Sequence, residues 1–155
     1  MSVPLIGERY RGAEGRIGYL LRQAWAQLRA AMDDALREHG LTAPQYATLT
    51  ILARDPGISG ADLARATMTT PQAMNGVIGT LERAGLVERH PHPTHGRILQ
   101  VDLTEEGHRR IAAARPVVEA LEERIEDGFS AEEVAVIKAW LVVAARRLER
   151  AGPEQ

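Results

Sequence analysis

The sequence predicts a mainly α-helical protein that carries a small β wing. Two short helical patterns follow each other closely between residues 59 and 84, and two short runs of alternating apolar and polar residues come directly after them. Longer helical patterns occupy both ends of the chain. The 155 residues include two tryptophans, three tyrosines and one phenylalanine. The core is therefore expected to consist mainly of Leu, Val, Ile and Ala, which suits closely packed helices.

The first two helices are predicted by apolar periodicity and by signals at their ends. Apolar residues recur with a helical period over residues 16–38, and Gly40 is expected to end this long helix. Thr42, with Gln45 three residues later, has the pattern of a capping box. This pattern predicts that a second helix begins here and stops near Pro56.

The two short helices that follow also have clear starting signals. Ser59 with Asp62 has a capping-box pattern that predicts the first of them, and Thr70 before Pro71 supplies an N-cap and a first helical residue for the second. In the second helix the apolar residues fall at positions i, i+3, i+4 and i+7, so one face is committed to the core. These apolar residues are Met74, Val77, Ile78 and Leu81.

The opposite face of this second helix carries small residues and side-chain amides. No charged residue lies between Arg65 and Glu82. Asn and Gln side chains pair with adenine edges in the DNA major groove, and glycine permits a close approach. The sequence therefore predicts a helix that contacts DNA bases. The residues expected to contact DNA are Thr70, Pro71, Gln72, Asn75, Gly76 and Thr80.

A two-stranded wing is predicted after Gly85, which is expected to end this helix. Residues 86–89 and 99–103 alternate between apolar and polar side chains, as strands with one buried face do. The loop between them is rich in proline and histidine. It also holds His95 and Arg97, which are the DNA contacts expected from the wing.

The order of these elements predicts a winged helix-turn-helix over about residues 41–103. In this motif the second short helix enters the major groove, and the wing lies beside it. The residues leave one alternative open, a helical hairpin with an attached β-hairpin and no role in DNA binding.

A long helix is predicted from Thr104 to about Asp127. Thr104 is expected to cap it, and Glu105 and Glu106 place acids at its positive end. Pro116 lies inside the pattern and is expected to kink the helix without dividing it. Apolar residues recur along it at spacings of three and four, as in the seam of a coiled coil. The seam residues are Ile111, Ala114, Val118, Leu121 and Ile125.

The last helix begins with another capping-box pattern, Ser130 with Glu133, and repeats the same seam spacing. Together with the first helix, these C-terminal helices have more apolar surface than a winged helix of this size covers. We therefore expect dimerisation helices at about residues 14–39 and 104–150, within one domain spanning residues 1–155. Packing of the two C-terminal helices against each other is the open alternative. The last seam contains Val134, Ile137, Leu141, Ala144 and Leu148.

A resemblance to a known family is carried by residues 40–49, 56–59, 62–64, 81–89 and 103–107 and by Arg97. In this order, and over nearly the whole chain, these segments closely resemble the MarR family of bacterial transcription regulators. The family usually has Asp-x-Arg at the wing tip, whereas this chain has His95-Gly96-Arg97. The chain also has Gly76 where family members often carry a basic or polar side chain.

The resemblance implies a ligand-responsive repressor that binds a pseudo-palindromic operator as a homodimer, with two recognition helices about one DNA turn apart. It also implies that a small aromatic or phenolic acid binds where the first helix, the Thr42 helix and the start of the Thr104 helix meet. Arg22, Trp25 and Tyr46 are the candidate residues, because they offer a cation and flat surfaces. Trp25 and Tyr46 are, however, of types more often found in the core.

Charge and cysteine content narrow the function classes. A net charge of -2 is not that of a strongly basic nucleic-acid-binding domain. Residues 119–133 hold seven acidic residues and one arginine, so any basic patch must be local. The absence of cysteine excludes disulfides, thiolate metal sites and thiol-based redox sensing. No apolar run approaches about 18 residues and no secretion signal is present, so we expect a cytoplasmic protein with no membrane partner.

Other chemistry has little support in the sequence. His90, His92 and His95 could supply nitrogen ligands to zinc or nickel, but the proline-rich loop favours exposed wing histidines. No cofactor is expected. No catalytic motif such as Gly-x-Ser-x-Gly or His-Glu-x-x-His occurs, so the chain is not expected to be an enzyme. Two functions stay open, a DNA-binding regulator and a dimeric helical adaptor that binds protein. The adaptor would expose apolar anchors on the outward helix face.

Overall fold

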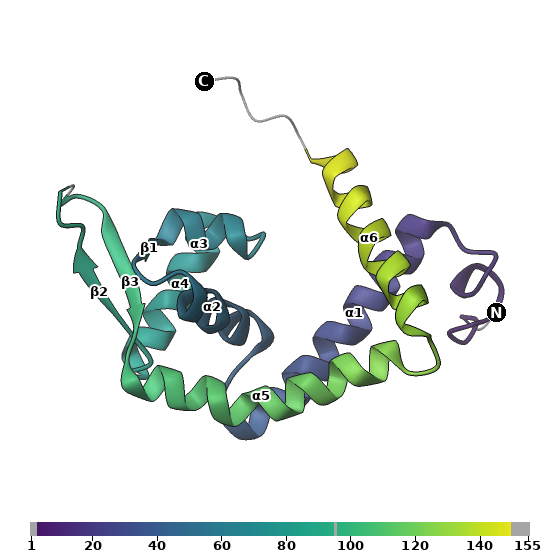
Figure 1. Cartoon of the computed structure of the whole chain (residues 1–155), viewed down its shortest axis with the longest axis horizontal. Coiled ribbons are helices and arrows are strands. Elements are labelled where there is room, and N and C mark those ends of the chain that lie inside the picture. Colours follow the sequence, from purple (N-terminus) through teal and green to yellow (C-terminus); the bar gives the residue numbers. More distant parts are fainter. Residues whose placement is uncertain (1–2, 95, 150–155) are drawn as a thin grey trace. The chain divides into compact units, whose positions relative to one another are not determined.

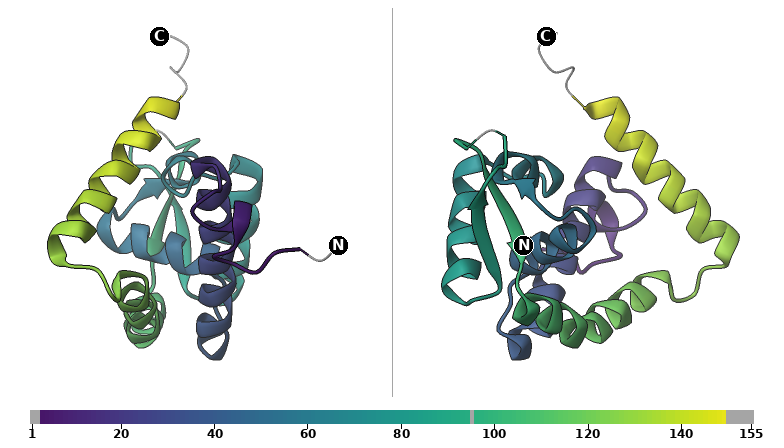
Figure 2. Two further views of the ribbon diagram at one scale, coloured as in Figure 1. Left: turned by 90° about the vertical axis from the view of Figure 1, so that its right-hand side faces the viewer. Right: turned by 60° about the vertical axis from the view of Figure 1, so that its left-hand side comes forward.

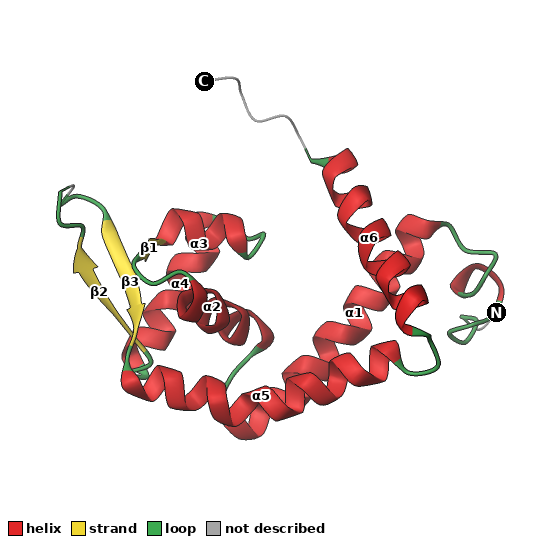
Figure 3. Ribbon diagram, viewed as in Figure 1, coloured by secondary structure: helices red, strands yellow, loops and turns green. Residues whose placement is uncertain are grey.

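The computed structural model of the chain describes residues 3–94 and 96–149 (Figure 1). Its contacts divide the chain into two compact units, Met1–Glu119 and Ala120–Gln155. Helices make up most of both units, and the described strands belong to the first (Figure 3). The expected fold class, mainly α with a small β wing, is confirmed. The elements are, in chain order, η1 (Arg9–Arg11), α1 (Ile17–Leu36), η2 (Arg37–His39), α2 (Ala43–Arg54), β1 (Ile58–Ser59), α3 (Gly60–Ala66), α4 (Pro71–Arg83), β2 (Val87–Pro91), β3 (Leu99–Leu103), α5 (Glu105–Glu126) and α6 (Ala131–Leu148).

The long helix α1 is preceded by a short 3-10 helix, η1, that is tied to it. Arg11 Nε donates to Gln23 Oε1 at 2.9 Å, and Gln23 Nε2 donates to Arg11 O at 3.1 Å. At its other end α1 passes into η2 and then into Gly40. The φ of Gly40 is +66°, the left-handed conformation that commonly ends a helix. The predicted end of the first helix is therefore confirmed.

Helix α2 begins with the capping box expected from the sequence. Gln45 N donates to Thr42 Oγ1 at 3.4 Å, and Thr42 N donates to Gln45 Oε1 at 2.9 Å. In addition, Ala43 N donates to Asp33 Oδ1 of α1 at 2.7 Å. These three bonds satisfy backbone donors that a helix start leaves without an internal partner, and the last of them joins α2 to α1.

Both helices of the helix-turn-helix begin with a side-chain cap. Asp62 N donates to Ser59 Oγ at 3.1 Å, and Ala73 N donates to Thr70 Oγ1 at 3.1 Å, which confirms the two N-caps. The Ser59 hydroxyl donates to the Asp62 carboxylate at 2.6 Å. In a full capping box this carboxylate would accept from the Ser59 backbone N–H, so the expected capping box is only half formed. The hydrogen bonds from Ser59 and Arg65 hold the pKa of Asp62 below its usual range.

The apolar face of α4 lies in the core of the first unit. Met74, Ile78 and Leu81 are each 1% exposed, and Val77 packs against the same cluster. Three closely packed side chains along one face fix the rotation of the helix, because turning it would expose them to water. The predicted division of α4 into a core face and an outward face is confirmed.

A three-stranded antiparallel sheet forms the wing and its base, with strand order β1-β3-β2. The two views in Figure 2 show β2 and β3 running side by side. Ile58 pairs with Val101 and Val87 pairs with Leu103, so the base of the wing joins the helix-turn-helix to the start of α5. Val101 and Val87 are both buried, which attaches the wing to the core.

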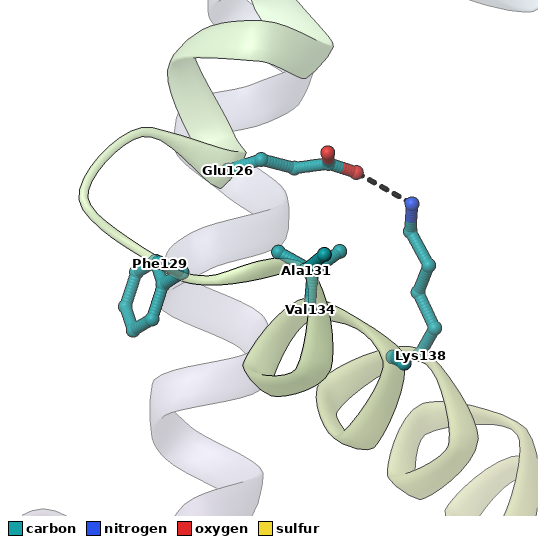
Figure 4. A pocket seen from close by; sticks show the side chains of 6 residues that line it. Glu126, Phe129, Ala131, Val134 and Lys138 are labelled. Atoms are coloured by element: carbon teal, nitrogen blue, oxygen red, sulfur yellow. Dashed lines mark ion pairs between the residues drawn. The ribbon is translucent and has the colours of Figure 1, made fainter.

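Helix α5 continues through Pro116 and is not divided there, as predicted. The kink expected at this position stays a prediction. The second unit contains the end of α5 and helix α6. Ser130 and Glu133 form the expected capping box at the start of α6. Lys138 Nζ and Glu126 Oε1 pair at 2.5 Å beside the turn between the helices (Figure 4). With Phe129, they line a hollow of about 470 Å³. None of the helices in the described part of the chain is long and apolar enough to cross a membrane.

Candidate nucleic-acid interface

Helix α4 presents its polar face to solvent. Thr70 caps its first turn and Pro71 is the first helical residue, so the helix begins at the position expected from the sequence. Because the apolar side chains are committed to the core, the remaining positions face outward. All six residues of this helix region that were predicted to contact DNA are exposed, namely Thr70, Pro71, Gln72, Asn75, Gly76 and Thr80.

A groove between the helix-turn-helix and the wing brings predicted residues from both elements together. Pro71, Asn75 and Arg97 line this groove, which has a volume of about 400 Å³. The Asn75 amide lies next to the first turn of α3, because a Cβ added at Gly60 would be 3.8 Å from Asn75 Oδ1. His95, the other wing residue predicted to contact DNA, lies outside the described residues.

Thr80 has hydrogen bonds within its own helix. Its hydroxyl donates to Gly76 O at 3.0 Å and accepts from Arg83 Nη2 at 3.1 Å. A hydroxyl has one hydrogen, so Thr80 can offer DNA an acceptor lone pair but no donor while this geometry holds. Arg83 was not among the predicted DNA contacts. It lies in the last turn of α4. The prediction was based on the uncharged stretch that ends before Glu82, and Arg83 lies just beyond that stretch.

An ion pair joins the end of α4 to the wing. Arg89 Nη2 and Nε lie 2.8 Å and 3.0 Å from the same oxygen, Glu82 Oε2. Arg89 also lines the groove that contains Asn75 and Arg97. Sequence reasoning missed this pair because its members lie on different elements, seven residues apart, and no periodicity relates a helix to the strand that follows its turn.

Asp102 on β3 makes a second link at the base of the wing. Its Oδ1 accepts from Gly57 N at 2.6 Å, and its Oδ2 lies 3.1 Å from His90 Nε2. The Asp102 carboxylate on β3 therefore connects the loop before β1 with β2, the strand paired with β3 on its other side. This role was also missed, since Gly57 and Asp102 are 45 residues apart in the sequence.

Two of the three histidines proposed as metal ligands, His90 and His92, interact with other groups in the structure. His90 faces Asp102, and the His92 Nδ1 atom lies 3.2 Å from Thr94 N and 3.1 Å from Thr94 Oγ1. Among the residues that the structure describes, no three His, Cys, Asp or Glu side chains are grouped so that they could hold a metal ion. His95 lies outside the described residues, so the three-histidine site stays a hypothesis.

The three effector candidates have different surroundings. Tyr46 is 8% exposed, and burial raises the pKa of its phenol, which also lies close enough to Arg115 and Glu119 for electrostatic interaction. Trp25 is 57% exposed in the single chain, so the core position expected for its residue type is not observed. Arg22 lines a hollow formed by η1 and α1, whose other lining residues are Arg11, Tyr19, Gln23, Ala26 and Gln27.

Comparison with known proteins adds to this geometry. A family model described as the MarR family matches residues 39–98. The HTH-type transcriptional repressor Rv2887 of Mycobacterium tuberculosis is 39% identical over 125 residues, which cover 81% of this chain and 90% of that protein. The transcriptional regulator HosA of Escherichia coli is 34% identical over 113 residues, covering 73% of this chain and 82% of that protein.

Solved structures share the fold. The crystal structure of Rv2887 in complex with DNA has a TM-score of 0.66 and 36% identity, and the match covers 83% of this chain and 97% of that one. The complex of Rv2887 with salicylic acid has a TM-score of 0.66 and 38% identity, with coverage of 83% and 96%. The crystal structure of CouR from Rhodococcus jostii RHA1 bound to p-coumaroyl-CoA has a TM-score of 0.78 and 25% identity, with coverage of 91% and 97%.

Proposed function

Because this chain belongs to the MarR family of transcription regulators, we propose that it is a sequence-specific repressor that binds double-stranded DNA as a homodimer. The observation that carries the proposal is the groove shared by α4 and the wing. It places Asn75, a neutral side chain suited to base edges, together with Arg97, a cation suited to phosphate or the minor groove. The DNA complex of the relative Rv2887 supports the same assignment.

The outward face of α4 fits a DNA contact better than a protein anchor. The large hydrophobic side chains that are exposed in the described residues lie outside α4. A protein-binding helix would place such side chains at its centre, because buried aromatic and aliphatic anchors carry most of the binding energy of protein interfaces. Small residues and amides instead allow a close approach to base edges. The adaptor hypothesis therefore has no supporting observation on this face.

The exposed apolar residues of α6 support the homodimer. Val136, Ile137 and Val142 lie on different sides of this helix, and all are exposed in the single chain. A helix that is apolar on all sides is stable in water only when it is covered. A second copy that covers α6 would form a two-fold dimer, and two α4 helices about one DNA turn apart would then meet a pseudo-palindromic operator.

Asn75→Ala tests base recognition. The probe is the duplex that the wild-type protein enriches from a random-sequence pool, compared with a scrambled duplex of the same composition. Losing an amide contact to a base typically costs about 1 to 3 kcal/mol on the right sequence and little on the wrong one. We expect fluorescence anisotropy titrations to show weaker binding of Asn75→Ala to the selected duplex, with unchanged binding to the scrambled duplex and an unchanged salt slope.

Arg97→Ala is the matched comparison, because it removes a cation expected to bind the DNA backbone and leaves the amides of α4 in place. Removing one phosphate interaction makes the salt slope shallower by about one unit. Binding to the selected and the scrambled duplex should therefore weaken together. If Asn75→Ala also weakens both duplexes equally, α4 does not recognise bases. If the wild-type protein enriches no sequence from the pool, the proposed function is wrong.

We also propose that a small aromatic or phenolic acid binds the first unit and weakens operator binding. The complex of the relative Rv2887 with salicylic acid supports this class of ligand. Tyr46 on α2, with Arg115 of α5 close enough to affect its pKa, offers a ring and a nearby cation. Arg22 and Trp25 stay candidates for the same role.

A panel of aromatic carboxylic acids that starts with salicylic acid tests the effector proposal. A ligand present at a hundred times its Kd adds about 2.7 kcal/mol to the stability of the folded state. For a chain of this size, the melting temperature should rise by roughly 5 to 10 °C. Affinity for the selected duplex should fall at the same ligand concentration. If millimolar concentrations change neither quantity, Arg22, Trp25 and Tyr46 should be dropped as effector residues.

A further inference from the structure

The ion pair between Glu82 and Arg89 lies at the proposed DNA surface itself. The Arg89 side chain is 27% exposed and the Glu82 side chain is 42% exposed, so both groups are accessible to solvent and to a ligand. Arg89 lines the groove that also contains Asn75 and Arg97. A free guanidinium at this position would be well placed to contact a phosphate of a duplex bound at this surface.

The Arg89 guanidinium lies close to the surface of the recognition helix. A Cβ added at Gly79 would be 3.9 Å from Arg89 Nη2 and 3.5 Å from Arg83 Nη1. Gly79 is on the helix turn that follows Asn75, so these two arginines lie beside the turn of α4 that also carries the predicted contact Thr80. Of the two, Arg89 is held by a carboxylate, whereas Arg83 donates to the neutral Thr80 hydroxyl.

The helix-turn-helix and the wing neutralise some of their cations and leave others unpaired. Arg65 pairs with Asp62 within α3, and Arg89 pairs with Glu82. Among the described residues, no carboxylate pairs with Arg83 or Arg97. In a chain with a net charge of -2, this division determines how many positive charges are available to DNA of any sequence.

We propose that Glu82 is a specificity-determining residue, because its carboxylate holds Arg89 away from the phosphate backbone. This inference rests on the proposed DNA-binding function. Phosphate contacts raise the affinity for every sequence, so withholding one cation lowers non-specific binding and leaves discrimination to side chains such as Asn75. Glu82 is thus a positioning residue that acts through Arg89 and need not touch DNA itself.

Glu82→Gln releases the Arg89 charge while keeping a side chain of the same size. Exposed ion pairs contribute little to stability, so the variant should fold and melt close to the wild-type temperature. One additional phosphate contact makes the salt slope steeper by about 0.9 unit. We expect the affinity for scrambled duplex to rise several-fold, the slope on that duplex to steepen by about one unit, and the preference for the selected duplex to fall.

Glu88→Gln is the control, because it changes the net charge by the same amount at another residue of this region, on strand β2. Glu88 is exposed, and no ion pair is described for it. Its slope on scrambled duplex should stay close to the wild-type slope. The double variant Glu82→Gln/Arg89→Gln has the wild-type net charge and no cation to release, so its slope should also return to the wild-type value.

The outcomes separate the inference from the proposed function. If Glu82→Gln and Glu88→Gln steepen the slope equally, net charge alone is responsible and the inference is wrong. If Glu82→Gln instead weakens binding to both duplexes and lowers the melting temperature, the pair is structural, and the inference is also wrong. Enrichment of a sequence by the wild-type protein tests the proposed function independently of all three variants. A wild-type protein that binds neither duplex overturns both.

Discussion

Leu141→Glu is expected to convert the dimer into a folded monomer. Leu141 is 43% exposed in the single chain, so a charge at this position costs the isolated chain little. In a dimer that covers α6, the same carboxylate would be buried without a partner, which costs about 3 to 5 kcal/mol. For each of the two carboxylates buried in the dimer, the Kd should therefore rise on the order of a hundredfold to several thousandfold. Light scattering at several protein concentrations measures the change.

Ala30→Glu is the matched control for this substitution. It adds the same charge at an exposed position of α1, on the side of that helix away from its exposed apolar residues Leu21 and Trp25. The control should stay dimeric, and both variants should keep the helical circular dichroism of the wild-type protein. A Leu141→Glu variant that is fully folded and still dimeric would show that α6 is peripheral and that the copies meet elsewhere.

Loss of the dimer should also change DNA binding. A monomer presents one α4 helix to one half of the operator, so its affinity for a full pseudo-palindromic site should approach its affinity for a half-site. Titration of Leu141→Glu with full and half sites measures this difference. Equal loss of affinity for both sites would indicate a damaged helix-turn-helix and not a lost dimer.

The local parts of the fold could be predicted because neighbouring residues decide them. Thr42 with Gln45 and Ser130 with Glu133 form capping boxes whose donors and acceptors are three residues apart. The core face of α4 follows from the spacing of its apolar residues, which the helix geometry converts directly into one side of the helix. The outward position of Asn75 is the consequence of that spacing, so this part of the candidate site was also predictable.

Contacts between separate elements could not be predicted in this way. The position of Arg89 beside Glu82 depends on the turn at Gly85 and on the pairing of β2 with β3. The spacing of residues in the sequence does not indicate which side chains these two features bring into contact. Trp25 shows a different limit. Its apolar character indicates that the residue should be covered, but does not indicate whether its own core or another molecule covers it.

Gly107→Ala is expected to destabilise the protein, because the start of α5 lies against Leu86 in the turn between α4 and β2. A Cβ added at Gly107 would be 2.2 Å from the backbone oxygen of Leu86, far closer than van der Waals contact allows. The backbone must then move apart, which strains the bonds from Thr104 N to Leu86 O at 3.1 Å and from Thr104 Oγ1 to Gly85 O at 2.6 Å. Overpacking of this kind typically costs about 1 to 3 kcal/mol.

The corresponding fall in melting temperature is roughly 3 to 10 °C for a chain of this size. Gly76→Ala is the matched control, because a Cβ added there meets no atom within 4 Å and alanine in a helix interior is favoured over glycine by about 0.5 to 1 kcal/mol. Its melting temperature should be unchanged or higher. A Gly107→Ala variant that melts with the wild-type protein would show that the close approach to Leu86 does not occur.

If Gly107→Ala melts early, its affinity for DNA, measured well below its melting temperature, tests the functional consequence. Gly85 and Leu86 lie in the turn after α4, so a displaced α5 should also tilt the recognition helix and weaken binding to the selected duplex more than to the scrambled one.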